Sequence, residues 1–144
     1  MPNDERQIFL KKEYAEAVRY MDNAKETLQK AQKDGAFYAD AKYVRTACGT
    51  AYLGVLIALD AWLKTKDVNL PQKKKQKSIE FYQENIAKLD GKMINRLNNV
   101  YRQLHLNGYY WGETNIKAIS GAFDSAYEII EKIKPEDAEA QETI

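Results

Sequence analysis

The sequence predicts an all-α protein that folds as an up-and-down four-helix bundle. Glycine and proline, which disfavour helix interiors, number only seven and three among 144 residues. Apolar residues recur at alternating spacings of three and four along most of the chain, as on the buried face of an amphipathic helix. A further segment, Thr46 to Leu59, carries no formal charge and is apolar almost all round. Such a helix must be surrounded by protein or lipid.

The first helix is expected over roughly residues 5–33. Lys, Glu, Arg and Gln fill the face opposite its apolar stripe. Asp34-Gly35 is expected to end this helix, because glycine adopts the left-handed conformation that closes many helices. We find no β-hairpin signal in the sequence. The apolar stripe consists of Leu10, Tyr14, Ala17, Met21, Ala24, Leu28 and Ala31.

The second helix is the predicted centre of the bundle. It begins with Asp40 as its N-terminal cap or near Ala36, and it continues to about Lys66. Its uncharged run of fourteen residues is shorter than the ~17–25 residues that span a bilayer, so we expect the core helix of a soluble protein. Cys48, the single cysteine, lies inside this run and is expected to be a small buried apolar residue.

The remaining helices are delimited by prolines and by residues that favour caps and turns. Pro71 suits the first turn of a third helix. At Asp90-Gly91 this helix either splits into two or continues with a kink. Residues 107–113 are expected to form a loop rich in aromatic residues and glycine. Thr114 is expected to cap the last helix, and Pro135 to end it.

The chain is expected to form one domain over residues 1–135, followed by an acidic, disordered tail over residues 136–144. Lysine plus arginine number 22 and aspartate plus glutamate 21, so the surface offers no strong field for nucleic acid or anionic membrane. The first residues lack the apolar core of a signal peptide, which predicts a cytoplasmic protein. One histidine and one cysteine exclude the usual di-iron and zinc sites, and we expect no metal and no cofactor.

Polar residues gather on one face of the helix expected around residue 100. Arg102 precedes the lone histidine, His105, by three residues, and Asn98 precedes Arg102 by four. An arginine can hold a phosphate while a histidine moves a proton near neutral pH, and exposed aromatic rings can stack a base. The other interpretation is structural: the polar residues edge a helix, and the aromatic residues close the end of the bundle. Those aromatic residues are Tyr109, Tyr110 and Trp111.

Residues 9–71 contain an alanine-rich amphipathic helix, a short turn and a buried helix that ends in a bulky apolar pair. Residues 108–133 contain a loop and a last helix whose alanines face the core. This order of small and large residues resembles the HEPN family of helical domains over nearly the whole chain. The chain is also similar to small, uncharacterised bacterial families that share this bundle.

The resemblance implies a specific chemistry. Active HEPN proteins are metal-independent ribonucleases in which two protomers bring their sites together. Their motif is an arginine, usually followed by a polar residue, with a histidine after four to six intervening residues. Here two residues separate Arg102 from His105, and eight separate Arg96 from His105. Neither spacing matches the motif.

The sequence therefore predicts a non-enzymatic, HEPN-like module for protein interaction or dimerisation. Its partner is expected to be a second copy of the chain or another protein, and we expect no membrane binding. The expected contact patch is formed by Tyr109 to Trp111. The alternative is a ribonuclease or nucleotide-binding protein that acts on RNA. In that alternative Arg102 binds phosphate, His105 acts as acid or base, and Tyr109 positions the substrate. A bundle that binds a small ligand is a third interpretation.

Overall fold

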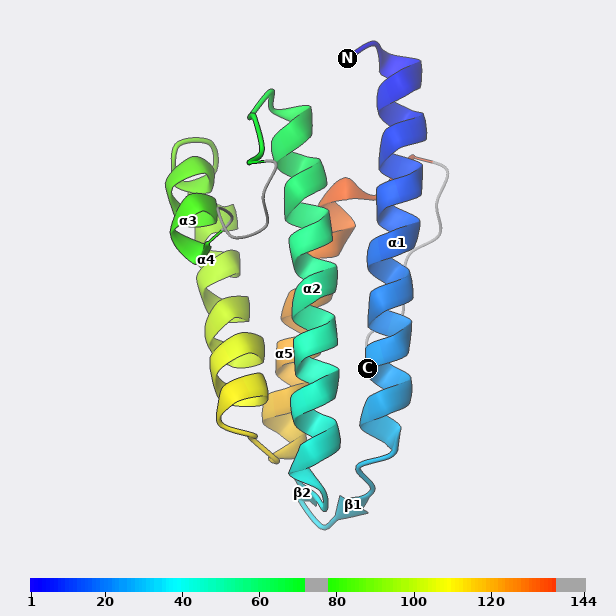
Figure 1. Cartoon of the computed structure of the whole chain (residues 1–144), viewed down its shortest axis with the longest axis vertical. Coiled ribbons are helices and arrows are strands. Elements are labelled where there is room, and N and C mark those ends of the chain that lie inside the picture. Colours follow the sequence, from blue (N-terminus) through cyan, green and yellow to red (C-terminus); the bar gives the residue numbers. More distant parts are fainter. Residues whose placement is uncertain (72–77, 137–144) are drawn as a thin grey trace.

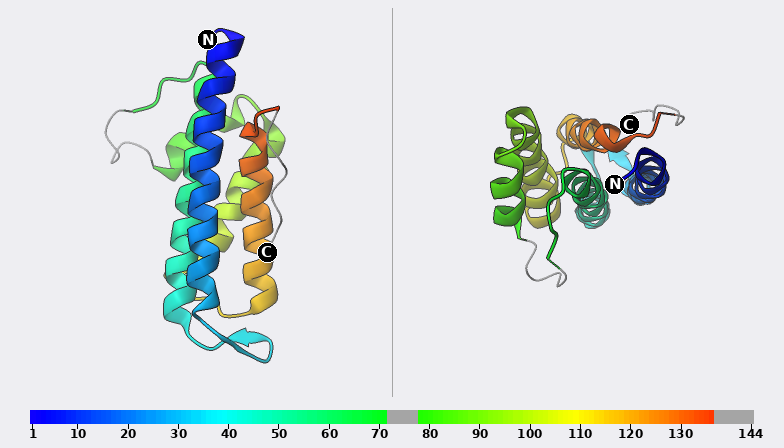
Figure 2. Two further views of the ribbon diagram at one scale, coloured as in Figure 1. Left: turned by 90° about the vertical axis from the view of Figure 1, so that its right-hand side faces the viewer. Right: turned by 90° about the horizontal axis from the view of Figure 1, so that it is seen from above.

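The structure, a computed structural model, describes residues 1–71 and 78–136. These residues confirm the all-α prediction. The α-helices are α1 (Asn3–Gln29), α2 (Ala41–Thr65), α3 (Ile79–Ala87), α4 (Gly91–Val100) and α5 (Ile116–Ile130). The other elements are strands β1 (Lys33–Asp34) and β2 (Phe37–Tyr38), the π-helix η2 (Tyr101–Tyr110) and the 3-10 turn η3 (Glu131–Ile133). Helices α1, α2, α5 and the continuous α4–η2 rod run side by side, and α3 lies beside α4 (Figure 1, Figure 2).

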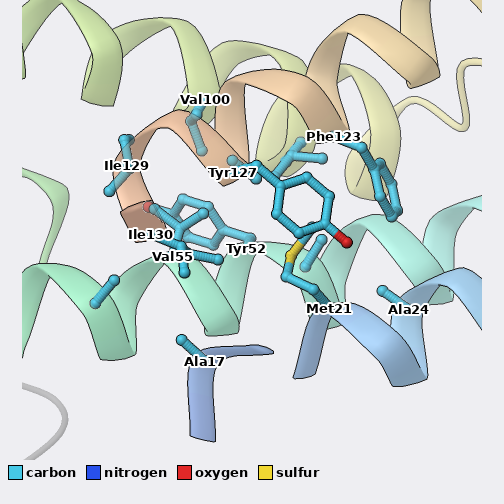
Figure 3. Packing of buried hydrophobic residues seen from close by; sticks show 14 of the residues in the cluster. Ala17, Met21, Ala24, Tyr52, Val55, Val100, Phe123, Tyr127, Ile129 and Ile130 are labelled. Carbon is cyan, nitrogen blue, oxygen red and sulfur yellow. The ribbon is translucent and has the colours of Figure 1, made fainter. Parts of the chain in front are cut away.

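Helix α2 lies at the centre of this arrangement, in contact with α1, α5 and η2. Every residue of the apolar stripe predicted for the first helix is buried. Gly54 of α2 lets α1 approach closely, since a Cβ there would stand 3.2 Å from the carbonyl oxygen of Ala17. Phe123 and Tyr127 of α5 pack into the same core, near Met21 of α1 (Figure 3).

The length of α2 does not by itself identify it as a core helix. Its 25 residues are long and apolar enough to cross a membrane by length and composition alone. Burial distinguishes a core helix from a membrane-spanning one. In the most apolar 18-residue stretch of α2, 61% of the residues are buried inside the fold, as expected for a core helix. No other helix in the described ranges meets the same test. The cytoplasmic location stays a prediction.

The connection between α1 and α2 differs from the prediction. Helix α1 ends at Gln29, and β1 pairs with β2 in an antiparallel hairpin, so the expectation of no β-hairpin is wrong. Each strand has two residues, too few to leave an alternating pattern in the sequence. Gly35 takes a φ of +62° in the turn. Asp40 caps α2 by accepting a hydrogen bond from the backbone N–H of Lys42 at 2.9 Å, which excludes a start near Ala36.

The third rod also begins later than predicted. Pro71 lies outside any helix, and α3 starts at Ile79 after the capping residue Ser78, so the predicted start at Pro71 is wrong. Residues 72–77 lie outside the described part of the chain. The predicted break is confirmed, because Asp90 accepts two backbone N–H bonds, at 2.9 and 3.1 Å, and caps the separate helix α4.

The predicted loop over residues 107–113 is wrong for most of its length. The chain stays helical to Tyr110, because η2 continues α4 without a break. The predicted cap at Thr114 is also wrong. Asn115 caps α5 instead, where its side chain accepts the N–H of Ala118 at 2.9 Å. Helical structure ends at η3, before Pro135, as predicted. Residues 137–144 of the expected tail lie outside the described residues.

Candidate functional site

The π-helix η2 aligns its aromatic residues in a column. Its backbone bonds reach five residues back, as in the 2.9 Å bond from Trp111 N to the carbonyl of Leu106. This wider turn brings residues four or five apart above one another. The His105 ring centroid lies 5.2 Å from that of Tyr101 and 5.9 Å from that of Tyr109, which is stacked on it. Tyr110 packs edge-on against His105 at 5.1 Å.

Helix α2 adds a fourth tyrosine to this group. The ring of Tyr52 lies 4.9 Å from that of His105 and 6.1 Å from that of Tyr101. The half-buried imidazole therefore contacts four phenol rings from two helices. We call this group the aromatic cluster; it consists of Tyr52, Tyr101, His105, Tyr109 and Tyr110.

Two glycines bring η2 against α2. Gly108 passes Cys48 with no room for a side chain, and a Cβ at Gly49 would stand 3.1 Å from the ring of Tyr109. Cys48 is fully buried, as the sequence predicted. Burial raises the pKa of its thiol to about 12, so the thiolate that cysteine chemistry needs is absent near neutral pH.

Arg45 of α2 fixes the end of the π-helix. Its guanidinium donates to the carbonyl of Tyr110 at 2.7 Å and reaches that of Tyr109 at 3.5 Å. The carbonyls at a helix end have no partner within the helix, and a cation also interacts favourably with them. Gly112, with a φ of +66°, leaves space for Arg45, because a Cβ there would stand 2.7 Å from its Nε.

A shallow groove of about 520 Å³ runs between α2 and η2 beside this cluster. Leu53 is 52% exposed at the groove, and Tyr109 is 45% exposed. Tyr110 is 57% exposed and contacts the rings of both His105 and Tyr109. The groove residues are Thr46, Gly49, Thr50, Tyr52, Leu53, Leu56, His105 and Tyr109.

The groove carries no charge at neutral pH. None of its lining side chains is an acid, a lysine or an arginine. Burial lowers the pKa of His105 below its usual value, so the imidazole is neutral. Burial likewise raises the pKa of Tyr52, whose phenol stays protonated. These side chains suit an apolar partner rather than an ionic one.

The structure places the predicted polar residues in separate contacts. Arg102 is exposed and donates to the side-chain oxygen of Asn99 at 2.7 Å. Asn98 accepts a bond from Gln83 of α3 at 2.9 Å, whereas His105 lies in the aromatic cluster. The expected common face assumed α-helical geometry, and in a π-helix residues three apart no longer lie above one another.

The predicted aromatic residues lie near one another but not in a loop. Tyr109 and Tyr110 end η2, and Trp111, which is 76% exposed, follows directly. Sequence reasoning missed Tyr52, Leu53 and the contact of Arg45. The run from Thr46 to Leu59 was expected to be surrounded on all sides, yet Leu53 is exposed. The signal that could have found this surface is a helix that is apolar all round. If neighbouring helices leave one side of such a helix uncovered, that side is an exposed apolar surface.

No group of three or more potential metal ligands occurs in the described ranges. The finding concerns His, Cys, Asp and Glu side chains.

Comparison with known proteins places the chain in a family. It is similar to a solved protein of unknown function from Dyadobacter fermentans, with 36% identity and a TM-score of 0.74 over 86% of this chain and 94% of that one. No curated protein matches the chain. Neither comparison names a HEPN protein, so the HEPN resemblance stays a prediction. Residues 12–135 match the family described as a domain of unknown function, DUF5618, and the chain belongs to that family.

Proposed function

We propose that this protein is a non-enzymatic association module that binds an apolar, uncharged protein surface over the groove between α2 and η2. The observation that carries this proposal is the continuity of the groove with exposed aromatic and aliphatic side chains. Of the eight large, exposed apolar side chains in the described residues, two line the groove, one contacts its lining, and one follows that residue directly in the chain. Contiguous apolar surface of this kind marks interaction sites, and tyrosine and tryptophan are enriched in them. The four are Leu53, Tyr109, Tyr110 and Trp111.

We call the groove residues together with Tyr110 the docking face. This face is held in place before any partner arrives. Arg45 holds the carbonyl at the end of η2, and the close approach of Gly108 to Cys48 fixes η2 on α2. Side chains that are already ordered lose little conformational freedom on binding, which favours association.

The ribonuclease alternative receives no comparable support. A general acid or base must be within hydrogen-bond reach of the group it serves. Arg102 instead binds Asn99, and the contacts of His105 are with tyrosine rings. We also propose that the fold is an HEPN-like four-helix bundle. Its support is the pattern of small and large residues over 9–71 and 108–133.

Photo-crosslinking in cells tests the proposal. A photoreactive phenylalanine at position 110 is expected to give adducts that protease removes and ribonuclease does not. The start of α1 lies at the opposite end of the bundle from the end of the α4–η2 rod (Figure 1). Ile8, in the first turns of α1 and 72% exposed, is the matched control position and is expected to give no adducts. Absence of adducts at position 110, or adducts removed by ribonuclease, contradicts the proposal.

A further inference from the structure

We propose that the partner is a second copy of this chain, and that Tyr110 of each copy enters the groove of the other. This inference rests on the association function proposed above and names the partner of the same docking face. It follows from two properties of that face, its shape and its lack of charge, and the histidine of the face supplies a test.

The docking face combines a concave and a projecting part. The groove between α2 and η2 has a volume of about 520 Å³, and the exposed ring of Tyr110 stands at its edge, in contact with Tyr109. A two-fold interface is formed by the same patch on both subunits, so a residue that fills a groove must lie on the face that carries the groove. An unrelated partner places no such requirement on this chain.

The charge of the face also permits self-association. Near a two-fold axis each side chain approaches its own copy, and like charges there cost several kcal/mol. The groove lining contains no formal charge at neutral pH. Arg45, the nearest cation on α2, has its guanidinium bound to the carbonyl of Tyr110. Two copies therefore meet without charge repulsion between the residues that line the groove.

Filling the groove changes the environment of His105. From α2 its ring faces Tyr52, and from η2 it faces Tyr101, Tyr109 and Tyr110. The charged side chains nearest in sequence on these helices, Arg45 and Arg102, bind elsewhere. Covering the groove removes more water from the imidazole and favours its neutral form further. Association then releases protons, and it weakens as the pH falls.

Sedimentation equilibrium of the purified full chain tests the inference. At pH 7.5 we expect a reversible dimer for the wild type and for the control Ile8→Ala. Leu53→Arg and Tyr110→Ala are expected to raise the dissociation constant at least about tenfold, since each removes a central apolar contact. Both residues are more than half exposed, so the variants should stay folded, which circular dichroism checks. A wild type that stays monomeric, or a dimer insensitive to both substitutions, overturns the inference.

The pH dependence gives a second readout. The dissociation constant is expected to rise as the pH falls from about 7.5 to 5.5, because an imidazole that is protonated in the monomer must lose its proton on association. His105→Gln is expected to remove most of this dependence. The chain has one histidine, so its ring proton resonance reports the pKa in monomer and dimer without ambiguity. Equal pKa values in the two states mean that the groove stays open, which overturns the inference.

The two proposals fail in different ways. Crosslinks to another protein from position 110 in cells, together with a monomeric purified chain, leave the association function standing and overturn the second copy. Loss of both the crosslinks and the dimer overturns the association function as well.

Discussion

Gly108 of η2 lies so close to Cys48 of α2 that a Cβ at position 108 would stand 2.4 Å from the sulfur and 2.6 Å from the cysteine Cβ. Real Cβ atoms do not approach that closely, so any larger residue must push η2 away from α2. This contact is where the groove, the aromatic cluster and the end of the π-helix are fixed relative to the core helix.

Gly108→Ala is expected to lower the free energy of unfolding by about 1–3 kcal/mol, the usual cost of overpacking. Urea denaturation measures it. Gly121→Ala in α5 is the matched control, because a Cβ there meets nothing within 4 Å. That control should be neutral or stabilise by up to about 1 kcal/mol through helix propensity. Equal stability of the Gly108 variant and the wild type would contradict the packing described.

Arg45→Ala is expected to loosen the end of η2 while leaving the bundle folded. The substitution removes the donor to the Tyr110 carbonyl, and the arginine is exposed, so the global loss should be about 1 kcal/mol or less. Hydrogen exchange should rise in residues 106–113 and stay unchanged in α1. Arg102→Ala, which removes a contact within one helical rod, is the control. Similar exchange in both variants would show that Arg45 does not hold this end.

Tyr82→Phe is expected to lower the free energy of unfolding by about 1–3 kcal/mol. The buried Tyr82 hydroxyl of α3 donates to an Asp60 carboxylate oxygen of α2 at 2.8 Å and ties the two helices together. Burial and the neighbouring Asp60 raise the pKa of this phenol, so it remains a donor at neutral pH. Tyr110→Phe alters an exposed hydroxyl and should change stability by less than about 0.5 kcal/mol. Chemical denaturation of both variants compares them.

The stability of the monomer is expected to fall as the pH is lowered through the range of histidine titration. Burial lowers the pKa of His105 in the folded state, so the unfolded chain binds more protons. The contribution of His105 to the free energy of unfolding is complete at pH values above its pKa in the unfolded chain, about 6.5. It is lost as the pH falls towards the lower pKa of the folded state. Melting temperatures of wild type and His105→Gln, at concentrations below dimerisation, measure it. A wild type and variant with parallel pH profiles would contradict this prediction.

The purified protein is expected to leave RNA intact, since Arg102 and His105 hold separate contacts. The assay is incubation with labelled single-stranded RNA in the presence of a chelator. Any cleavage must be compared with that of His105→Ala and Arg102→Ala. Cleavage that both substitutions abolish would restore the ribonuclease alternative.

The sequence determined what depends on neighbours along the chain. The buried stripe of α1 follows from helical periodicity, and the cap at Asp40 follows from a side chain that bonds the backbone two residues ahead. The break at Asp90-Gly91 follows from residues that favour turns. The sequence also indicated the exposed aromatic residues Tyr109 to Trp111, because they are adjacent in the chain. Each of these features is local, so a short window of sequence contains its cause.

Only the tertiary structure decided the geometry of the candidate site. A spacing of four between Tyr101, His105 and Tyr109 fits an α-helix or a π-helix, and the sequence around Gly108 suggested a loop. The contacts that support the π-helix come from α2, through Cys48, Gly49 and Arg45, which lie 60 or more positions earlier in the chain than the residues they contact. Packing between distant segments selects among backbone conformations that local preferences leave nearly equal in energy, and that selection brings Tyr52 and Leu53 to the face where His105 lies.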